Sequence, residues 1–264
     1  MINIICALKH EARPIIDHFQ LVQAGSSRSF TTFSNRDDIT LTVTGVGKEA
    51  ADAGTRYAID HYRPDESSTW LNVGIAGHRH LKVGTPVLAA SITDAASGRE
   101  WRHHLARISH HHSAAVADPL AVMDRTPPDR FDVVSATPSA SFSPCDPSRR
   151  RLDALATDAG EKFGLAFPAG LETLPLLTVA QPMDEYPDTA MIDMEASGFF
   201  RSASSITAME RIHCLKIISD NLLNPARNIG KQSVIDLVTE NIHVIEQLLE
   251  QLRNCPVNSD TATS

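Results

Sequence analysis

The sequence predicts an α/β fold whose sheet is largely parallel and covered by helices on both faces. Short apolar runs typical of buried strands alternate with segments of helical periodicity, which is the pattern of parallel strands joined by crossover helices. Glycines follow several of the strand-like runs, for example Gly45 and Gly74, where the chain leaves the sheet. The chain has 264 residues, 42% of them hydrophobic, so it can bury one large core and a single domain is the default.

The N-terminal elements are predicted from periodicity and from turn residues. A strand over 2–8 precedes a helix over 11–19, in which Pro14 is tolerated only in the first turn. Strands over 29–34 and 39–44 form a pair around the turn at 35–38. A helix then runs from Lys48 to Tyr62 and ends before Pro64. The next strands are expected at 70–73, which ends in the glycine-containing segment 74–77, and at 85–92.

The C-terminal elements begin after a segment rich in Ser, Pro, His and Arg. Residues 95–150 are interpreted as surface excursions around one strand at 131–136, and a helix is predicted over 151–163. A strand is expected at 174–179. The strongest helical pattern spans 232–253, where Ser233 and Asp236 resemble a capping box, and we assign this helix to packing. We predict one domain over residues 1–255 and a disordered tail over 256–264.

Charge and composition exclude several classes of partner. Twenty-four basic and 32 acidic residues give a net charge of −8, which disfavours a generic nucleic-acid or anionic-membrane surface and favours a small ligand. No apolar run approaches the roughly 18 to 20 residues of a membrane span, and the N-terminus lacks a signal peptide's features. A cytoplasmic protein is therefore expected, with Cys6 and Cys214 as reduced core residues.

Carboxylates close three of the predicted strands. The segment 191–200 reads MIDMEASGFF and the segment 214–221 reads CLKIISDN, so each is an apolar strand that leads to an acid, Glu195 or Asp220. Glu11 follows the first strand. The ends of parallel strands meet at one rim of a sheet, so these acids are expected to share a site.

A structural interpretation of the same acids is that they cap helices. A carboxylate at a helix start satisfies free amides, which suits Asp220, and a first-turn acid interacts favourably with the helix dipole, which suits Glu195. The coincidence of three acids at matching strand ends favours a site over three independent caps.

Other motifs do not point to a cofactor or a metal. Gly45-Val-Gly47 resembles a dinucleotide-binding turn, but the strand about 20 residues later carries Asn72 where an acid would hold the ribose. A P-loop is excluded because Thr42 stands at the required glycine. The histidines at 103–112 have no interleaved carboxylate or thiolate, so a solvated loop is expected there. Neighbouring Trp101 and Arg99 could close over a ligand.

The order of the motifs resembles the nucleoside phosphorylase superfamily, nearest the methylthioadenosine/S-adenosylhomocysteine nucleosidase branch. The motifs are ALKHE at 7–11, TGVGK at 44–48, NVGIAG at 72–77 followed by KVG at 82–84, DME at 193–195 and ISD at 218–220. The resemblance implies a single three-layer α/β/α domain around a twisted mixed sheet. It also implies a homodimer without a cofactor.

The resemblance implies roles for individual residues in cleaving the N-ribosidic bond of a purine-type nucleoside. Asp220 matches the acid that protonates the base, Glu195 the carboxylate that binds the ribose diol, Met194 a residue packed on the sugar, and Glu11 the base that activates water. The remaining assignments are grouped by the side of the substrate. Gly47, Ile75 and Lys216 are assigned to the nucleophile or phosphate side, and Ala180, Gln181 and Ser219 to the base side.

The nature of the nucleophile depends on Glu11. A carboxylate repels phosphate, by roughly 4 kcal/mol for two unit charges at about 4 Å and an effective dielectric of 20, whereas it suits the activation of water. The sequence therefore favours hydrolysis. Phosphorolysis stays open, with phosphate as a co-substrate, because Arg13 and Lys48 could assemble a phosphate site.

Three departures from the family pattern leave the base and the activity open. Ile75 stands where the family has a hydroxyl, Lys216 where it has an arginine, and residues 178–182 read TVAQP, without the usual base-stacking phenylalanine. Gln181 could read a base edge, or it could be an ordinary loop residue. A catalytically silent nucleoside-binding protein is therefore an alternative to an enzyme.

Overall fold

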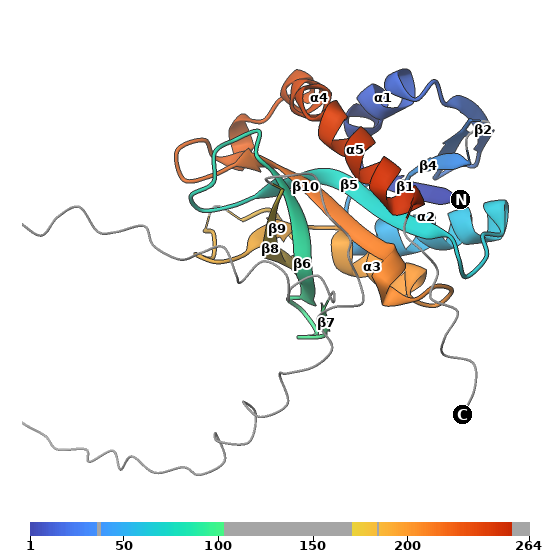
Figure 1. Cartoon of the computed structure of the whole chain (residues 1–264). Helices are drawn as coiled ribbons and strands as arrows, with labels where there is room; N and C mark the ends of the chain where they lie inside the picture. The colour runs from blue at the N-terminus through green and yellow to red at the C-terminus, as the bar shows by residue number, and fades with distance from the viewer. Residues whose placement is uncertain (36–37, 103–170, 184, 255–264) are drawn as a thin grey trace, which may run out of the picture. The chain divides into compact units, whose positions relative to one another are not determined.

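A mixed β-sheet with helices on both faces forms the centre of the fold (Figure 1). The computed structural model describes residues 1–35, 38–102, 171–183 and 185–254. The strands are β1 (Ile2–Cys6), β2 (Val22–Ser26), β3 (Thr31–Ser34), β4 (Ile39–Val43), β5 (Thr69–Gly77), β6 (Pro86–Asp94), β7 (Glu100–Arg102), β8 (Glu172–Thr178), β9 (Met191–Asp193) and β10 (Ile212–Asp220). The helices are α1 (Lys9–His18), α2 (Lys48–Tyr62), α3 (Ala196–Ala203), α4 (Lys231–Glu240) and α5 (Ile242–Arg253), with short 3-10 helices η4 (Met209–Arg211) and η5 (Ala226–Asn228).

The centre of the sheet is parallel, and part of the sheet closes on itself. Strands β4, β1, β5 and β10 pair in parallel, while β3 and β2 extend the β4 edge through antiparallel pairings. Strand β10 also pairs with β6, and β6, β8 and β9 lead back to β5. This ring brings the carboxyl ends of β5 and β10 next to the short strand β9, and β1 pairs with β5 outside the ring.

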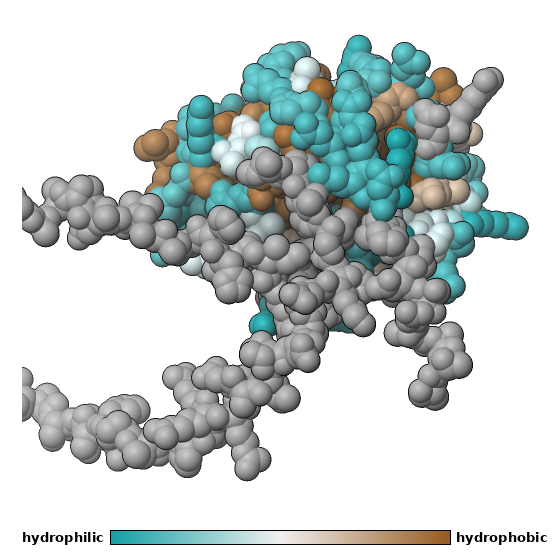
Figure 2. Space-filling model, viewed as in Figure 1, coloured by the Kyte–Doolittle hydropathy of each residue, from teal (hydrophilic) through white to brown (hydrophobic). Residues whose placement is uncertain are grey.

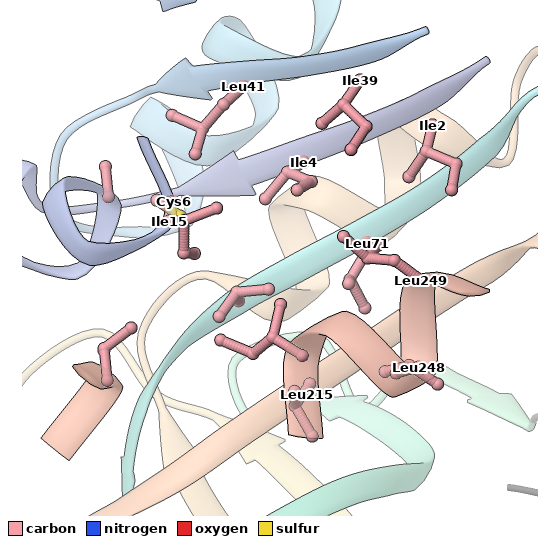
Figure 3. Packing of buried hydrophobic residues seen from close by; sticks show 14 of the residues in the cluster. Ile2, Ile4, Cys6, Ile15, Ile39, Leu41, Leu71, Leu215, Leu248 and Leu249 are labelled. Carbon is pink, nitrogen blue, oxygen red and sulfur yellow. The ribbon is translucent and has the colours of Figure 1, made fainter. Parts of the chain in front are cut away.

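Each face of the sheet has its own hydrophobic core. On one face, α1, α4 and α5 cover side chains from β1, β4, β5 and β10, and Figure 3 shows Leu248 and Leu249 of α5 opposite Leu71 and Leu215 of the sheet. On the other face, α2 and α3 cover a second core that includes Trp70 and Phe199. The outward side of α4 and α5 is mostly hydrophilic, as expected for amphipathic helices (Figure 2). The three-layer α/β/α architecture expected from the sequence is confirmed.

Several predicted elements are confirmed, with two differences in helix boundaries. The hairpin of β3 and β4, the helix from Lys48 to Tyr62, and the strands that end at Gly77 and Asp220 are present. Helix α1 begins at Lys9, because the Glu11 carboxylate accepts a hydrogen bond from the backbone N–H of Leu8 and closes the helix start there. Pro14 therefore lies beyond the first turn, where it was not expected.

The long helix predicted over 232–253 is two helices that meet at Asn241. The Asn241 side chain donates hydrogen bonds to the carbonyls of Gly84 (3.1 Å) and Leu237 (2.9 Å), which interrupts the helical ladder. The predicted capping box is wrong, because α4 begins at Lys231 and Ser233 lies inside the helix. A periodic apolar pattern can continue across such a break, since both helices pack their apolar side chains into the same core on one face of the sheet.

Some predictions fall outside the described residues. These are the strand at 131–136, the helix at 151–163, the histidine-rich segment at 103–112 and the tail at 256–264. The single domain over 1–255 stays a prediction. Within the described residues, no helix is both long and apolar enough to span a bilayer.

Candidate active site

The three acids singled out in the sequence come together at one cavity. It has a volume of about 400 Å³ and lies at the carboxyl ends of β1, β5 and β10. Six of the predicted site residues line it, namely Glu11, Ile75, Met194, Glu195, Ser219 and Asp220. The carboxyl ends of parallel strands are the usual place for a ligand in an open α/β sheet.

Glu11 is held by two backbone amides at the buried side of this cavity. Its Oε2 accepts from the N–H of Leu8 at 2.8 Å and its Oε1 from the N–H of Ile75 at 3.0 Å. Burial raises the pKa of the Glu11 carboxyl, although these amides and the charge of Lys216 oppose the shift. Ile75 thus contributes its backbone, so a hydroxyl side chain at this position is not needed to hold Glu11.

Lys216 lies behind the cavity and pairs with an acid that the sequence analysis did not assign. Its Nζ is 2.9 Å from Oδ2 of Asp193, and both side chains are almost fully buried. Burial would lower the pKa of Lys216, but Asp193 and Glu195 raise it well above its ordinary value. Lys216 does not line the cavity, so its charge serves the buried carboxylates rather than forming an exposed phosphate subsite.

Asp193 organises the start of α3. Its Oδ1 accepts from the Thr178 hydroxyl at 2.8 Å, and its Oδ2 accepts from the N–H of Ala196 at 2.9 Å as well as from Lys216. Asp193 is therefore the acid that caps α3. The sequence signal for it was its place in the same DME segment as Glu195, with an apolar strand before it.

Glu195 occupies the N-cap position of α3, yet its side chain does not cap the helix. Its Oε1 accepts from the backbone N–H of Gly47 at 2.9 Å. Burial and the neighbouring Asp193 raise the pKa of Glu195 to about 7, against the opposing effects of Lys216 and Gly47. Gly47 has a φ of 98°, a conformation that favours glycine, so its amide can reach the carboxylate. Gly47 thus lies beside the predicted ribose-binding acid.

Asp220 accepts hydrogen bonds from two hydroxyl groups. The Ser219 hydroxyl lies 2.5 Å from Oδ1 and the Tyr186 hydroxyl 2.6 Å from Oδ2. Consecutive strand residues normally point to opposite faces, but a register shift between Ile218 and Asp220 marks a bulge, and both Ser219 and Asp220 line the cavity. No helix begins directly after Asp220, so the capping interpretation does not hold for it.

The base-side assignments of Ala180 and Gln181 remain predictions. Both residues are exposed and neither is among those that line the cavity, whereas their neighbours Val179, Pro182 and Met183 are. The same loop also supplies Tyr186, which the sequence analysis did not single out. A lone tyrosine in a polar loop carries no sequence signal that distinguishes it from a surface residue.

The cations considered for a phosphate site are engaged elsewhere. The Arg13 side chain is 73% exposed and pairs with Asp17, and Lys48 pairs with Asp94 at 3.0 Å. Burial acts to raise the pKa of Asp94, but Lys48 and two amides outweigh it and lower that pKa to about 2. Lys231, the first residue of α4 and one residue before the predicted packing helix, does line the cavity.

Trp101 does not line the main cavity. It packs on Phe200 with ring centroids 5.8 Å apart, and the Arg99 guanidinium lies 4.8 Å from the centre of its ring. Arg99 and Trp101 line a separate cavity of about 230 Å³.

Within the described part of the chain, no group of three or more His, Cys, Asp or Glu side chains could hold a metal ion.

Solved structures that resemble this chain include nucleosidases. The 5′-methylthioadenosine nucleosidase of Arabidopsis thaliana matches with a TM-score of 0.62 and 12% identity, over 97% of this chain and 96% of that one. The methylthioadenosine/S-adenosylhomocysteine nucleosidase of S. pneumoniae matches at 0.59 and 14%, over 95% and 99%. The chain has the nucleosidase fold.

A third solved structure with the same fold is named for a different substrate. The futalosine hydrolase of Helicobacter pylori has a TM-score of 0.57 and 15% identity, over 95% of this chain and 97% of that one. No protein-family model matches the sequence. The fold implied by the motif order is therefore confirmed, and the activity has to be argued from the site.

Proposed function

We propose that this protein is an enzyme that hydrolyses the N-ribosidic bond of a purine-type nucleoside. The observation that carries the proposal is the convergence of Glu11, Glu195 and Asp220 on one cavity. Cleavage of this bond builds positive charge on the sugar and negative charge on the departing base. A carboxylate near the sugar and a proton donor near the base match that charge distribution.

Each acid has a chemical task in this proposal. Asp220 gives its proton to the base as the C–N bond breaks, and the bonding electrons leave with the base. Glu195, with Met194 beside it, binds the ribose diol. Glu11 takes a proton from the water that attacks the sugar carbon, and its raised pKa makes it a stronger base than an exposed glutamate.

Hydrolysis is favoured over phosphorolysis by the charges around Glu11. Lys216, whose charge acts on Glu11 from behind the cavity, already pairs with Asp193, and Arg13 is directed to solvent. The buried carboxylate would repel an incoming phosphate dianion. Phosphorolysis remains the second candidate because Lys231 and His10 line the cavity and could supply positive charge to it.

The test is a panel of purine and pyrimidine nucleosides, including 5′-modified ones, assayed for free base with and without phosphate. Adenosine derivatives belong in the panel, since a nucleosidase of this fold from Colwellia psychrerythraea was solved with adenine. We expect release of a purine in phosphate-free buffer, and its loss in Glu11→Gln and Asp220→Asn. Turnover that requires phosphate would establish the phosphorylase alternative.

The silent binding protein is separated from the enzyme by the same variants. If wild type releases no base and Asp220→Asn binds a nucleoside as tightly as wild type, the protein is a binding module.

We also propose a cytoplasmic homodimer on the strength of the motif resemblance, with the buried free cysteines Cys6 and Cys214 suited to a reducing compartment. Sedimentation equilibrium would show a monomer if the dimer is wrong.

A further inference from the structure

Tyr186 contacts the proposed acid from a loop that the catalytic roles above do not use. This residue lies between β8 and β9, its side chain is buried, and its hydroxyl donates to Oδ2 of Asp220 at 2.6 Å. We propose that Tyr186 is a positioning residue that stabilises Asp220 as this acid gives up its proton. The inference rests on the proposed function, because it concerns the same proton transfer.

The close approach of Tyr186 and Asp220 is built into the fold. A Cβ at Gly77 would lie 2.5 Å from both Cε1 of Tyr186 and Oδ2 of Asp220, so only glycine leaves room for the two side chains. The loop that carries Tyr186 is tied to the segment after β5 by an ion pair, in which Nε of Arg79 lies 3.0 Å from Oδ1 of Asp188. The Tyr186 side chain also belongs to a small apolar cluster with Val179 and Ile192.

The Ser219 hydroxyl can reach a second acceptor besides Asp220. The Ser219 hydroxyl lies 2.5 Å from Oδ1 and 3.3 Å from the carbonyl oxygen of Ala76, so it can turn from the first acceptor to the second. Rotation of Ser219 releases Oδ1 to carry the proton that goes to the base. Oδ2 meanwhile keeps its hydrogen bond to Tyr186.

The Tyr186 bond is stronger in the transition state than in the ground state. With Asp220 protonated on Oδ1, Tyr186 donates to a neutral carbonyl oxygen. As the Oδ1–H bond breaks and the base gains the proton, the electron pair stays on Asp220, and Tyr186 then donates to a carboxylate. Hydrogen bonds to ionised acceptors are shorter and about twice as strong, so this contact lowers the barrier without tightening substrate binding.

The substitution Tyr186→Phe removes only the tyrosine hydroxyl, so the other groups that surround Asp220 are still present in the variant. On β5 and the loop after it, Gly77 has no side chain, and the N–H of His78 donates to the Asp220 carbonyl at 3.0 Å. Burial lowers the pKa of His78, whose Nδ1 accepts from the amides of residues 80 and 81. Glu11 and Glu195 line the same cavity, as does Lys231 of α4.

The test compares Tyr186→Phe with Tyr62→Phe. The control also removes one tyrosine hydroxyl bond, from Tyr62 to the carbonyl of Phe33 at 3.2 Å, but away from the cavity. We expect kcat of Tyr186→Phe to fall roughly 10- to 100-fold with KM within about threefold of wild type, because one charge-assisted bond is lost. The alkaline limb of its pH–rate profile should move to higher pH, because a weaker acid keeps its proton longer.

Two outcomes overturn the inference. The first is an unchanged kcat, and the second is a reduced kcat with an unmoved alkaline limb, which a purely structural role would produce. If Tyr186→Phe does not fold, the three tyrosines of the chain can be replaced with 3-fluorotyrosine. The fluorinated hydroxyl is a stronger hydrogen-bond donor, so it should move the alkaline limb to lower pH. An unmoved limb with fluorotyrosine also overturns the inference.

The failure of this inference is distinguishable from the failure of the proposed function. If wild type releases no base from any nucleoside, the proposed function fails. If wild type is active and Asp220→Asn is not, while Tyr186→Phe behaves as wild type, only the role of Tyr186 fails. In an Asp220→Asn background with residual activity, adding Tyr186→Phe should leave the rate unchanged within about twofold.

Discussion

Around one buried lysine, three carboxylates compete for the same positive charge. Lys216 forms its ion pair with Asp193, and its charge also lowers the pKa of Glu11 and of Glu195. One cation cannot offset the burial of three acids, so the pKa values of Glu11 and Glu195 remain raised. Protonation of these residues is therefore set by the site's net charge as well as by burial.

The raised pKa of Glu195 predicts a pH dependence of substrate capture. Since its folded-state pKa is about 7, the carboxylate that accepts the ribose hydroxyls is lost as the pH falls through 7. We expect kcat/KM of an active ribonucleoside to decline below about pH 7, and this limb to be absent in Glu195→Gln. Exposed Glu240→Gln should keep the wild-type limb, and a wild-type limb near pH 4.5 would contradict the assignment.

The buried ion pair predicts a stability difference that urea unfolding can measure. Lys216→Met leaves Asp193 buried without its cation, which should lower the free energy of unfolding by roughly 3–5 kcal/mol. Arg13→Met removes an ion pair whose side chains are 73% and 68% exposed, and should cost under about 1 kcal/mol. Similar losses in the two variants would show that the buried pair is not structural.

At the scale of secondary-structure elements, the ends of helices and strands place the acidic side chains at the cavity. Helix α1 starts where Glu11 closes its own N-terminus, and the bulge near the end of β10 directs both Ser219 and Asp220 to one cavity. Helix α3 starts directly after Glu195 and packs against α2 so closely that a Cβ at Gly198 would overlap the carbonyl oxygen of Lys48. The α2–α3 contact therefore holds Glu195 near Gly47.

The close contact of α2 and α3 predicts the effect of Gly198→Ala. The added methyl group must push the backbones apart, which should cost roughly 1–3 kcal/mol or more in thermal unfolding. Activity should fall as well, since α3 carries Glu195 at its start. Gly230→Ala is the control for stability only, because Gly230 lines the cavity; its Cβ would have only Ser233 Oγ nearby, at 3.8 Å, and its φ of −95° suits alanine. Equal stability of the two variants would contradict the packing argument.

For the whole molecule, closure of the sheet decides where a ligand can bind. The ring of β5, β10, β6, β8 and β9 brings segments from both halves of the chain to one cavity. A ligand in this cavity contacts the first strand's helix, the glycine-rich end of β5 and the loop before β9. Binding should therefore stabilise the fold as a unit.

Ligand-induced stabilisation is measurable in a variant that does not consume its substrate. Asp220→Asn with adenosine at about 100 times Kd should gain roughly 2.7 kcal/mol, which raises Tm by roughly 5 °C for a chain of this size. Adding Glu195→Gln should reduce the shift at the same concentration, because the diol loses its charged acceptor. A shift of the same size in both variants would remove Glu195 from the ribose site.

Most of the fold and the three acids that line the cavity could be predicted from the sequence, because their signals are local. Apolar runs, helical periodicity and the acid at the end of each run are encoded within a few residues of one another, as at Glu11 and Asp220. The base-side wall could not be predicted in this way. The described residues of the segment 179–190, which exclude 184, form no regular element, and whether Gln181 or Tyr186 turns inward depends on packing against other strands.

The sequence by itself determined the α/β architecture, most of its strands and helices, and the three acids at strand ends. Only the tertiary structure decided which groups meet those acids. Gly47 and Glu195 are 148 residues apart, and Tyr186 and Asp220 are 34 apart. Such contacts depend on strand pairing, on the bulge in β10 and on the space left by Gly77, none of which leaves a periodic signal in the chain.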